Sequence, residues 1–410
     1  MLDFKKLVFV GLDPHKSQHT GVMIDHWNHV LWSAQIPNLP SEFPAFLDQV
    51  DAATPKGFIA VFGIEDTGGL GRSLAQWLVA QDRLVKGVNP ILSDERRNKR
   101  PHSDKNDTQD ARSVARVLTE DFDTLPTVQE DAHFQALREG TRRRDQLVKD
   151  RTRCKNQLHG LLHTHYPDYK AFFSDPFGKT ALAFWHAYPH PSELRHIGTT
   201  RLIRFLRKQA RNMSTGRAEL ILQHVDKEKP VAADDAIRIT VVRQLVEHLQ
   251  QLGEHIATIE ALLAKEVATV EAHLTTLHGV SNVTAAKIGG RIGPPDRFRS
   301  GDQIARHAGI APQERTSDRR GRVRRSKSGD RQLNAAFHQI ALNQICVTRD
   351  GQPRCPIAYH YYHRKIAEGK SKLSALTCLK RRLCDIVFAM LRDRSVYQPP
   401  DLAALRKPAA

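Results

Sequence analysis

Apolar runs alternate with amphipathic segments along roughly the first 120 residues of the chain. Runs rich in β-branched and aromatic residues predict five strands, at residues 6–12, 19–25, 29–36, 57–64 and 84–88. The first three follow one another directly, with Trp27-Asn28 as a hairpin turn. Apolar residues at helical spacing predict helices at 40–50, 70–81 and 107–118. This alternation predicts an α/β fold for the N-terminal domain.

The pattern becomes helical beyond about residue 130. Seven apolar residues follow the 3/4 alternation of a coiled coil: Val242, Leu245, Leu249, Leu252, Ile256, Ile259 and Leu263. Periodicity leaves open whether the partner helix is residues 134–166 of the same chain or belongs to a second protomer. Residues 168–236 mix Pro, Gly and short basic helices such as 201–211, and the sequence assigns them no role.

Residues 274–293 place Gly279-Val280 between two expected helices. This helix-hairpin-helix-like segment offers backbone N–H groups to a phosphate, and a plain turn at the permissive glycine is the alternative. A chain of 410 residues exceeds what one hydrophobic core usually organises. We therefore expect three domains: an α/β domain at 1–125, a helical coiled-coil region at 126–270 with an insert at 168–236, and a mainly α domain at 271–400.

No apolar run approaches the length of about 18 residues that a membrane span requires. The apolar segment behind Lys5 and Lys6 ends at Asp13, which is too short for a secretory leader. Five cysteines form no CxxC pair, which argues against a disulfide framework or a zinc cluster. We expect a cytoplasmic protein without a membrane partner.

Charge points to a polyanionic partner, because 62 Lys and Arg oppose 45 Asp and Glu, for a net charge of +17. The alternative is a basic chain that is merely soluble. Residues 315–331 carry eight Lys or Arg and a net charge of +6, and residues 138–155 carry eight more on an expected helix. Such clusters favour salt-sensitive binding to nucleic-acid backbones. The candidate contacts are Arg142, Arg143, Arg144, Lys149, Arg319, Arg320, Arg322, Arg324, Arg325 and Lys327.

Four carboxylates occupy informative positions in this pattern. Asp13 and Glu65 each end an expected buried strand, and Asp107 and Asp110 share one face near a helix start. Carboxylate oxygens suit Mg²⁺, and two such ions about 4 Å apart can activate an attacking oxygen and stabilise a leaving one. Turn and capping roles are the alternative for each acid alone. Asp104 is a competing ligand in a polar loop, and we prefer Asp107.

Four motifs, GLDPHK, GIEDTGGLG, GVNP and KNDTQDAR, occur in an order and spacing that resemble the N-terminal domain of the DEDD insertion-sequence transposases. That domain is RuvC-like, with an RNase H fold. Residues 277–333 resemble the second domain of the same family. Together the two resemblances cover about two thirds of the chain.

The resemblance implies that Asp13, Glu65, Asp107 and Asp110 bind Mg²⁺. It also implies a nucleophilic serine after an Ala-Gly-Leu-x-Pro segment, which in this chain reads AGIAP. Ser317 is the candidate, although Asp318 stands where the family usually has Gly. Lesser candidates are Thr316, Ser326 and Ser328. No histidine lies beside Ser317 in the sequence, so we expect the metal site to assist its attack on a DNA phosphorus.

Partners are also implied by the resemblance. They are donor and target DNA, a structured noncoding bridge RNA that pairs with both, and further copies of the chain, as dimers that join into tetramers. The heptad at 242–263 is a plausible contact between copies. Such a recombinase acts in a prokaryotic cytoplasm and is associated with the nucleoid when it is bound to DNA.

Three rival interpretations remain at this stage. A Holliday-junction nuclease would share the RuvC-like domain but hydrolyse DNA with water, and an inactive relative would only bind nucleic acid. A tyrosine nucleophile among Tyr359, Tyr361 and Tyr362 is the third. The alternative for these tyrosines is a helix pair whose rings pack or stack while nearby Lys and Arg face phosphates.

Overall fold

The computed structural model forms two compact units, Met1–Ala132 with Gly293–Arg299, and His133–Ile292 with Ser300–Ala410. Each unit is described by itself. The residues described are 3–65, 69–98, 106–129, 132–227, 236–269, 273–311, 313–315, 322–324 and 329–400.

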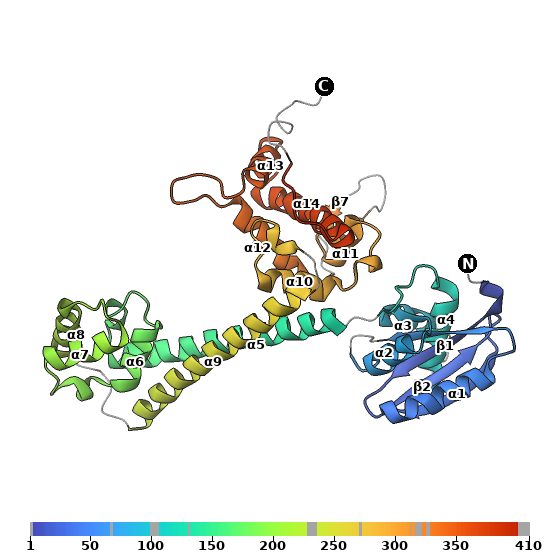
Figure 1. Cartoon of the computed structure of the whole chain (residues 1–410), viewed down its shortest axis with the longest axis horizontal. Helices are drawn as coiled ribbons and strands as arrows, with labels where there is room; N and C mark the ends of the chain where they lie inside the picture. The colour runs from blue at the N-terminus through green and yellow to red at the C-terminus, as the bar shows by residue number, and fades with distance from the viewer. Residues whose placement is uncertain are drawn as a thin grey trace. The chain divides into compact units, whose positions relative to one another are not determined.

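The first unit is built on a sheet of five strands, in the order β3-β2-β1-β4-β5 (Figure 1). β1 and β2 are antiparallel, as are β2 and β3, whereas β4 runs parallel to β1 and β5 parallel to β4. All five expected strands are confirmed, with bounds β1 (Leu7–Pro14), β2 (Gln18–Ile24), β3 (Val30–Pro37), β4 (Ile59–Glu65) and β5 (Val85–Val88). Asn28 has φ +66° in the turn before β3, where the sequence predicts a hairpin.

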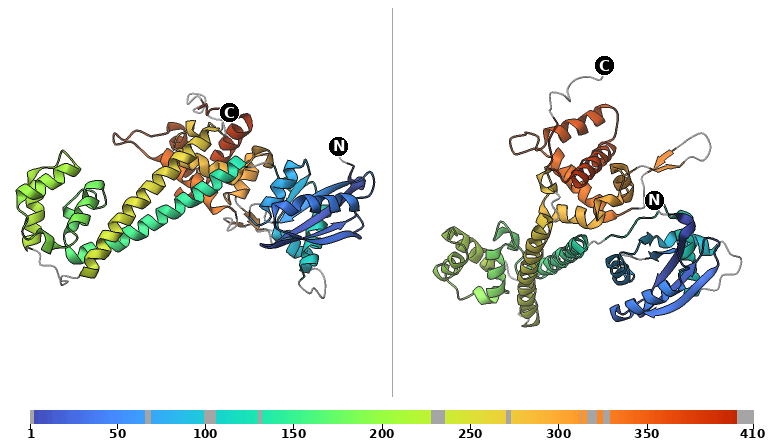
Figure 2. Two further views of the ribbon diagram at one scale, coloured as in Figure 1. Left: turned by 60° about the horizontal axis from the view of Figure 1, so that its bottom comes forward. Right: turned by 45° about the vertical axis from the view of Figure 1, so that its right-hand side comes forward.

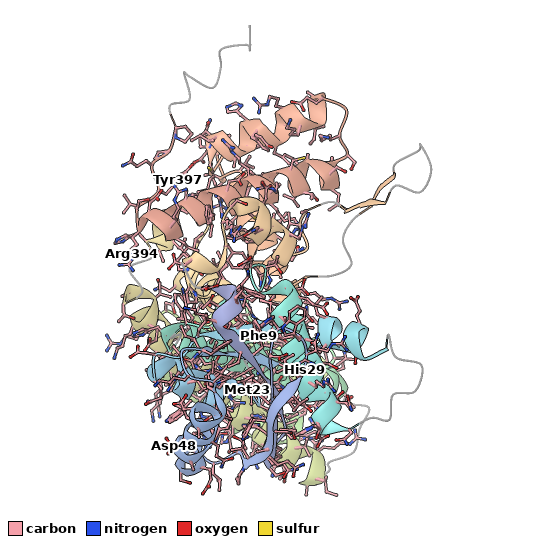
Figure 3. The ribbon with its side chains drawn as sticks, turned by 90° about the vertical axis from the view of Figure 1, so that its right-hand side faces the viewer. Phe9, Met23, His29, Asp48, Arg394 and Tyr397 are labelled. Atoms are coloured by element: carbon pink, nitrogen blue, oxygen red, sulfur yellow. The ribbon has the colours of Figure 1, made fainter. Side chains whose placement is uncertain are left out.

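Helices cover both faces of this sheet because its central strands are apolar on both sides. Phe9 and Met23, labelled in Figure 3, belong to the hydrophobic cores on opposite faces. α1 (Phe43–Ala53) and α2 (Arg72–Ala80) pack on the face with Met23, and α4 (Asp107–Asp121) packs on the face with Phe9. Three short 3-10 helices, η1 (Phe4–Lys6), η2 (Pro40–Glu42) and η6 (Pro295–Arg297), also belong to this unit, and α3 (Pro90–Asn98) contacts α4.

Gly11 of β1 allows α4 to approach the sheet at backbone distance. A β-carbon at this position would lie 2.1 Å from the carbonyl oxygen of Ala111 and 2.3 Å from the amide nitrogen of Ala115. Any side chain larger than hydrogen would therefore force the helix away from the strand.

Two helices of 34 residues, α5 (Ala132–His165) and α9 (Ala236–Thr269), run antiparallel in the second unit (Figure 2). Arg144 Nε lies 2.9 Å from Glu260 Oε1, and the Cys154 thiol donates to the Leu245 carbonyl at 3.4 Å. Leu158 of α5 and Leu249 of α9 are buried in the same core. Residues 132–165 of the same chain therefore supply a partner for the heptad seam.

The segment to which the sequence assigns no role forms a small aromatic core at the end of this helix pair. Tyr169, Phe172 and Trp185 are buried there together with residues of α5 and α9. Its elements are η3 (Tyr169–Ala171), α6 (Lys179–Ala187), η4 (Pro191–Leu194), α7 (Thr199–Gln209) and α8 (Thr215–Lys227).

The C-terminal part is mainly helical, as expected. Its elements in the second unit are η5 (Leu274–Thr276), α10 (Asn282–Ile292), α11 (Gly301–His307), β6 (Gln313–Arg315), β7 (Arg322–Arg324), α12 (Arg331–Ile345), α13 (Pro356–Ala367) and α14 (Lys372–Asp393). α14 contacts α11, α12, α13 and η5, and Gly279 adopts φ +87° in the turn between η5 and α10. None of the helices in the described ranges has the length and hydropathy needed to cross a bilayer.

Replacement of Gly11 by Ala tests the close approach of α4. We expect a loss of about 1–3 kcal/mol or more in the free energy of unfolding, because the new methyl group overlaps the α4 backbone. Chemical denaturation of the full chain measures it. Gly160→Ala is the control, since a β-carbon there meets no atom within 4 Å in a helix, where alanine is favoured over glycine. Equal stabilities of Gly11→Ala and the wild type would contradict the packing argument.

Candidate metal centre

Asp13 and Glu65 lie side by side at one edge of the sheet. β1 and β4 are parallel neighbours, and their last registered pair, Leu12 with Ile64, comes directly before the two acids. Both side chains are half-buried. The carboxyl ends of parallel strands form the usual binding edge of an α/β sheet, so this placement agrees with the position expected from the sequence.

The first turn of α4 carries the other two acids. Asn106 caps the helix by accepting a hydrogen bond from the Thr108 amide at 3.0 Å, so Asp107 and Asp110 fall in the first turn. The close approach at Gly11, one turn further along the helix, holds this turn near the end of β1. The charges of both acids act on Asp13, and that of Asp110 also acts on Glu65. The structure therefore places Asp107 and Asp110 near Asp13, and Asp110 near Glu65.

His15 joins this cluster from the segment after β1. Its Nε2 atom lies 3.2 Å from Asp13 Oδ2 and 3.4 Å from Asp107 Oδ1. One ligand atom from each of these three residues lies within 4.8 Å of the other two. Reasoning from sequence gave His15 no role, although it belongs to the GLDPHK motif, because a single histidine in a loop has no pattern of its own.

Ser93 of α3 contacts the remaining acid. Its hydroxyl donates a very short hydrogen bond to Glu65 Oε1, and Oγ also lies 3.0 Å from the Pro90 carbonyl oxygen. Asp94, the next residue, adds another negative charge near Glu65. The sequence interpretation missed both residues, since it did not recognise α3 behind the GVNP motif.

Burial and mutual repulsion both oppose ionisation of the two strand acids. Burial is the main reason that the pKa of Asp13 is raised, and the negative charges of Asp110 and Asp107 add to it, against the opposing effect of His15. Burial likewise raises the pKa of Glu65, with smaller contributions from Asp13, Asp110 and Asp94, against the hydrogen bond from Ser93. Clustered carboxylates of this kind gain stability from a bound divalent cation, so the donor set fits a metal of the Mg²⁺ type.

Two family models match the chain. One, for the DEDD transposase of IS110, matches residues 10–167, and the other, for the transposase IS116/IS110/IS902 family, matches residues 271–355. The two matches together cover more than half of the chain. The chain belongs to the IS110/IS116 transposase family. Family membership implies a transposase that acts on DNA.

Proteins of three insertion elements extend the similarity over nearly the full length of the transposase. The uncharacterised 44.8 kDa protein of IS116 from Streptomyces clavuligerus is 26% identical over 96% of each chain. The 42 kDa protein of IS900 from Mycobacterium paratuberculosis is 28% identical over 97% of this chain and 98% of its own. The 43.6 kDa protein of IS110 from Streptomyces coelicolor is 27% identical over 95% of each.

The serine candidate of the transposase lies in a connection between two paired strands. β6 and β7 are antiparallel, with Arg315 opposite Arg322, and residues 316–321 join them. Further along the chain, the Asp330 amide donates to the His307 carbonyl at 2.7 Å. Arg322 and Arg324 lie on β7. Outside the described residues are Asp104, Thr316, Ser317, Asp318, Arg319, Arg320, Arg325, Ser326, Lys327 and Ser328.

The basic helix of the transposase presents part of its charge to solvent. Arg142, Arg143 and Lys149 are exposed on α5, whereas Arg144 is half-buried in its ion pair with Glu260. This difference makes Arg144 a structural contact between α5 and α9.

A small basic cavity of about 100 Å³ adjoins this helix. Arg142 and Lys149 line it together with Lys287 and Arg291 of α10. Lys287 pairs with Asp145 at 2.8 Å, and Arg291 pairs with Asp330 at 3.2 Å. Sequence reasoning missed Lys287 and Arg291, because they stand far along the chain from the charge cluster they join.

The raised pKa of Asp13 predicts a stability that depends on pH and metal. Below the ordinary carboxyl pKa, Asp13 is neutral in the folded and in the unfolded state. The free energy of unfolding then falls as pH rises through the pKa that Asp13 has in the folded state. In a chelator at about pH 7.5, Asp13→Asn should therefore melt at a higher temperature than the wild type, and the difference should vanish near about pH 3.

Asp51→Asn is the matched control for this measurement, because Asp51 is a surface acid in an ion pair with Arg83. It should gain no thermal stability at about pH 7.5. A lower melting temperature for metal-free Asp13→Asn would contradict the electrostatic argument.

Proposed function

We propose that this transposase cuts and rejoins DNA with a Mg²⁺ site at Asp13, Glu65, Asp107 and Asp110 and with Ser317 as nucleophile. The observation that carries the proposal is the convergence of these acids from β1, β4 and the first turn of α4. These acids come from three separate segments and lie at one edge of the sheet. If each acid served only a turn or a helix cap, the acids would not need to lie close together.

The fold of the first unit supports a nuclease-type chemistry. We assign its sheet, in which three antiparallel strands are extended by two parallel ones, to the RNase H-like, RuvC-like class. The acids at the ends of β1 and β4 support this assignment. Bound Mg²⁺ supplies Lewis acidity to the attacking and leaving oxygens of a phosphodiester.

The residues around the four acids keep the ligands in place. Ser93 holds one oxygen of Glu65 by a hydrogen bond, which leaves the other oxygen for a cation. His15 lies between Asp13 and Asp107, and its interaction with Asp13 favours the charged form of that carboxyl group. The two contacts orient three of the four carboxylates before a metal binds.

The proposed chemical step is a reversible transesterification. The Ser317 oxygen attacks phosphorus, a bond from phosphorus to a DNA oxygen breaks, and the serine proton ends on the released DNA hydroxyl. One phosphoester bond replaces another, so a DNA hydroxyl can reverse the step and reseal the strand without a high-energy cofactor. The proposal requires Ser317 and the four acids to act on one phosphodiester, within one protomer or between two.

Contacts between the basic residues and nucleic-acid backbones complete the proposal. Arg142, Arg143 and Lys149 on α5, and the arginines that flank Ser317, would hold phosphates, while a structured guide RNA supplies sequence specificity by base pairing. The net charge of +17 supports binding of both nucleic acids. We place the reaction in a dimer that joins into a tetramer, on DNA in a prokaryotic cytoplasm.

A covalent adduct tests the proposed chemistry. Protein purified with its bound RNA is incubated with donor and target DNA and Mg²⁺, and denaturing gels detect a protein–DNA adduct. We expect the adduct to disappear in Asp13→Ala, in Ser317→Ala and in a chelator. Ser326→Ala is the matched control and should retain it. DNA cleavage without an adduct, abolished by Asp13→Ala but not by Ser317→Ala, would instead indicate a hydrolytic junction nuclease.

The salt dependence of DNA binding tests the basic helix. Arg142→Gln and Lys149→Gln should each weaken binding of all sequences and reduce the slope of log Kd against log salt by about one. Arg392→Gln serves as the control, because the Arg392 guanidinium is already paired with Asp393 at 2.7 Å. Unchanged slopes for both α5 variants would remove this helix from the nucleic-acid interface.

A further inference from the structure

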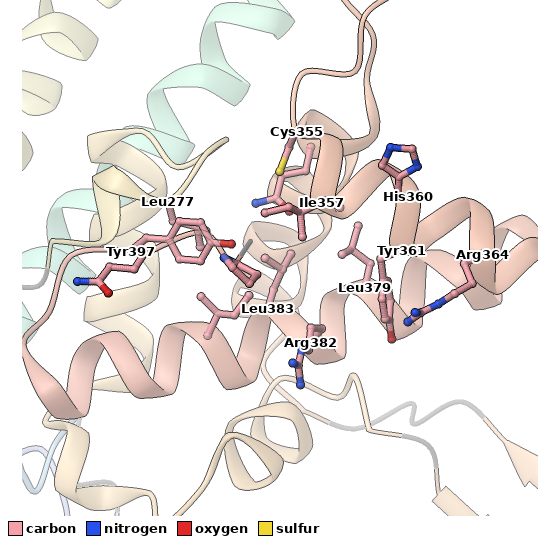
Figure 4. A pocket seen from close by; sticks show the side chains of 15 residues that line it. Leu277, Cys355, Ile357, His360, Tyr361, Arg364, Leu379, Arg382, Leu383 and Tyr397 are labelled. Carbon is pink, nitrogen blue, oxygen red and sulfur yellow. The ribbon is translucent and has the colours of Figure 1, made fainter. Parts of the chain in front are cut away.

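A second pocket, of about 720 Å³, lies in the C-terminal part of the second unit (Figure 4). Its walls come mainly from α13 and α14, while Leu277 and Tyr397 contribute from the segments before α10 and after α14. This volume falls within the range of about 300–1,000 Å³ that is usual for ligand cavities. None of the four acids lines this pocket, whereas Tyr361, one of the tyrosines considered as a rival nucleophile, does.

The floor of the pocket is apolar and its two ends are aromatic. Leu277, Leu379 and Leu383 are buried, and Figure 4 shows the two leucines of α14 between Tyr397 and Tyr361. The Tyr397 amide donates to Thr276 Oγ1 at 2.9 Å, which fixes the backbone of that tyrosine. Burial raises the pKa of Tyr397, so its ring stays neutral at physiological pH. The apolar floor and aromatic ends of the pocket therefore suit a flat, uncharged group.

The rim of the same pocket is positively charged. Arg364 and Arg382 line it, and none of the residues that line it is an Asp or Glu. The Arg364 guanidinium lies 5.4 Å from the centroid of the Tyr361 ring, so a cation and an aromatic ring are offered together. Its ion pair with Glu368 is exposed and 3.7 Å long, which makes the pair weak. The rim therefore suits an anion.

The combination of floor and rim restricts the occupant. An aliphatic helix would bury both arginines without an anionic partner, and a free inorganic anion would leave the apolar floor uncovered. A nucleotide has the required pair of properties, because a flat base is joined to a phosphate. Aromatic side chains with neighbouring cations are the usual means of holding unpaired bases.

We propose that this pocket holds one unstacked nucleotide of a DNA strand, with the base on the apolar floor against Tyr361 and the phosphate against Arg364 and Arg382. The inference rests on the proposed function, because strand cleavage and exchange expose unpaired bases in the DNA substrate. It adds a binding site for single-stranded DNA that is separate from the metal centre and from the basic helix.

Binding measured without metal separates this site from catalysis. The full-length protein is mixed, in a chelator, with labelled single-stranded DNA, with duplex DNA of the same sequence and with the matching RNA, and fluorescence anisotropy gives each Kd. Loss of one aromatic contact should weaken single-strand binding about tenfold, so Tyr361→Leu should show this loss for single-stranded DNA and none for the duplex. Tyr361→Phe should bind as the wild type does.

The controls come from the same two helices. Tyr362→Leu changes the adjacent tyrosine of α13, which does not line the pocket, and should leave each Kd unchanged. Arg382→Gln should weaken single-strand binding more than Arg392→Gln, which alters a paired arginine of α14. Arg382 is exposed, so its replacement should not disturb folding. A change in the Kd of Arg382→Gln therefore reports a lost contact with DNA.

Several outcomes would overturn the inference. Wild-type affinity for single-stranded DNA in both Tyr361→Leu and Arg382→Gln would exclude the pocket, and equal losses for duplex and single strand would indicate backbone contacts only. A loss confined to RNA would assign the pocket to RNA instead of DNA. The measurement requires neither metal nor DNA cleavage, so failure of the proposed chemistry leaves it interpretable.

Discussion

The backbone contact between β1 and α4 is the constraint on which the candidate metal centre depends. Because Gly11 has no side chain, the helix lies directly against the strand, and its first turn falls beside the carboxyl end of the sheet. Strand pairing alone brings Asp13 and Glu65 together, but only this contact adds Asp107 and Asp110. The candidate metal centre thus depends on a packing contact in the apolar core as well as on the four acids themselves.

The protein itself stabilises the charged forms of Asp13 and Glu65 only in part. His15 and Ser93 offset some of the unfavourable burial of Asp13 and Glu65, yet the pKa of each remains raised. Sites that concentrate like charge before a ligand arrives commonly reduce the stability of a fold. The apolar cores on both faces of the sheet supply the stability that permits this arrangement.

The sequence predicts the elements of this protein that have a regular pattern of apolar residues, and the residues at which such elements end. The five strands and the positions of Asp13 and Glu65 follow from apolar runs and their ends, and the heptad of α9 follows from its spacing. The intrachain partner of that heptad does not, because periodicity carries no information about which helix faces it. The aromatic core around Trp185, and the contacts of His15 and Ser93, arise from tertiary packing of residues without a local pattern.

The length of the α5–α9 pair has a consequence for the geometry of nucleic-acid binding. At 1.5 Å per residue, helices of 34 residues span about 51 Å. The aromatic core packs against one end of the pair, and Gly290 of α10 contacts Arg138 near the other. With a rise of 3.4 Å per base pair, the full length of the helix pair equals about fifteen base pairs of duplex. Insertion or deletion of whole heptads in both helices would change the spacing between the two ends by about three base pairs per heptad.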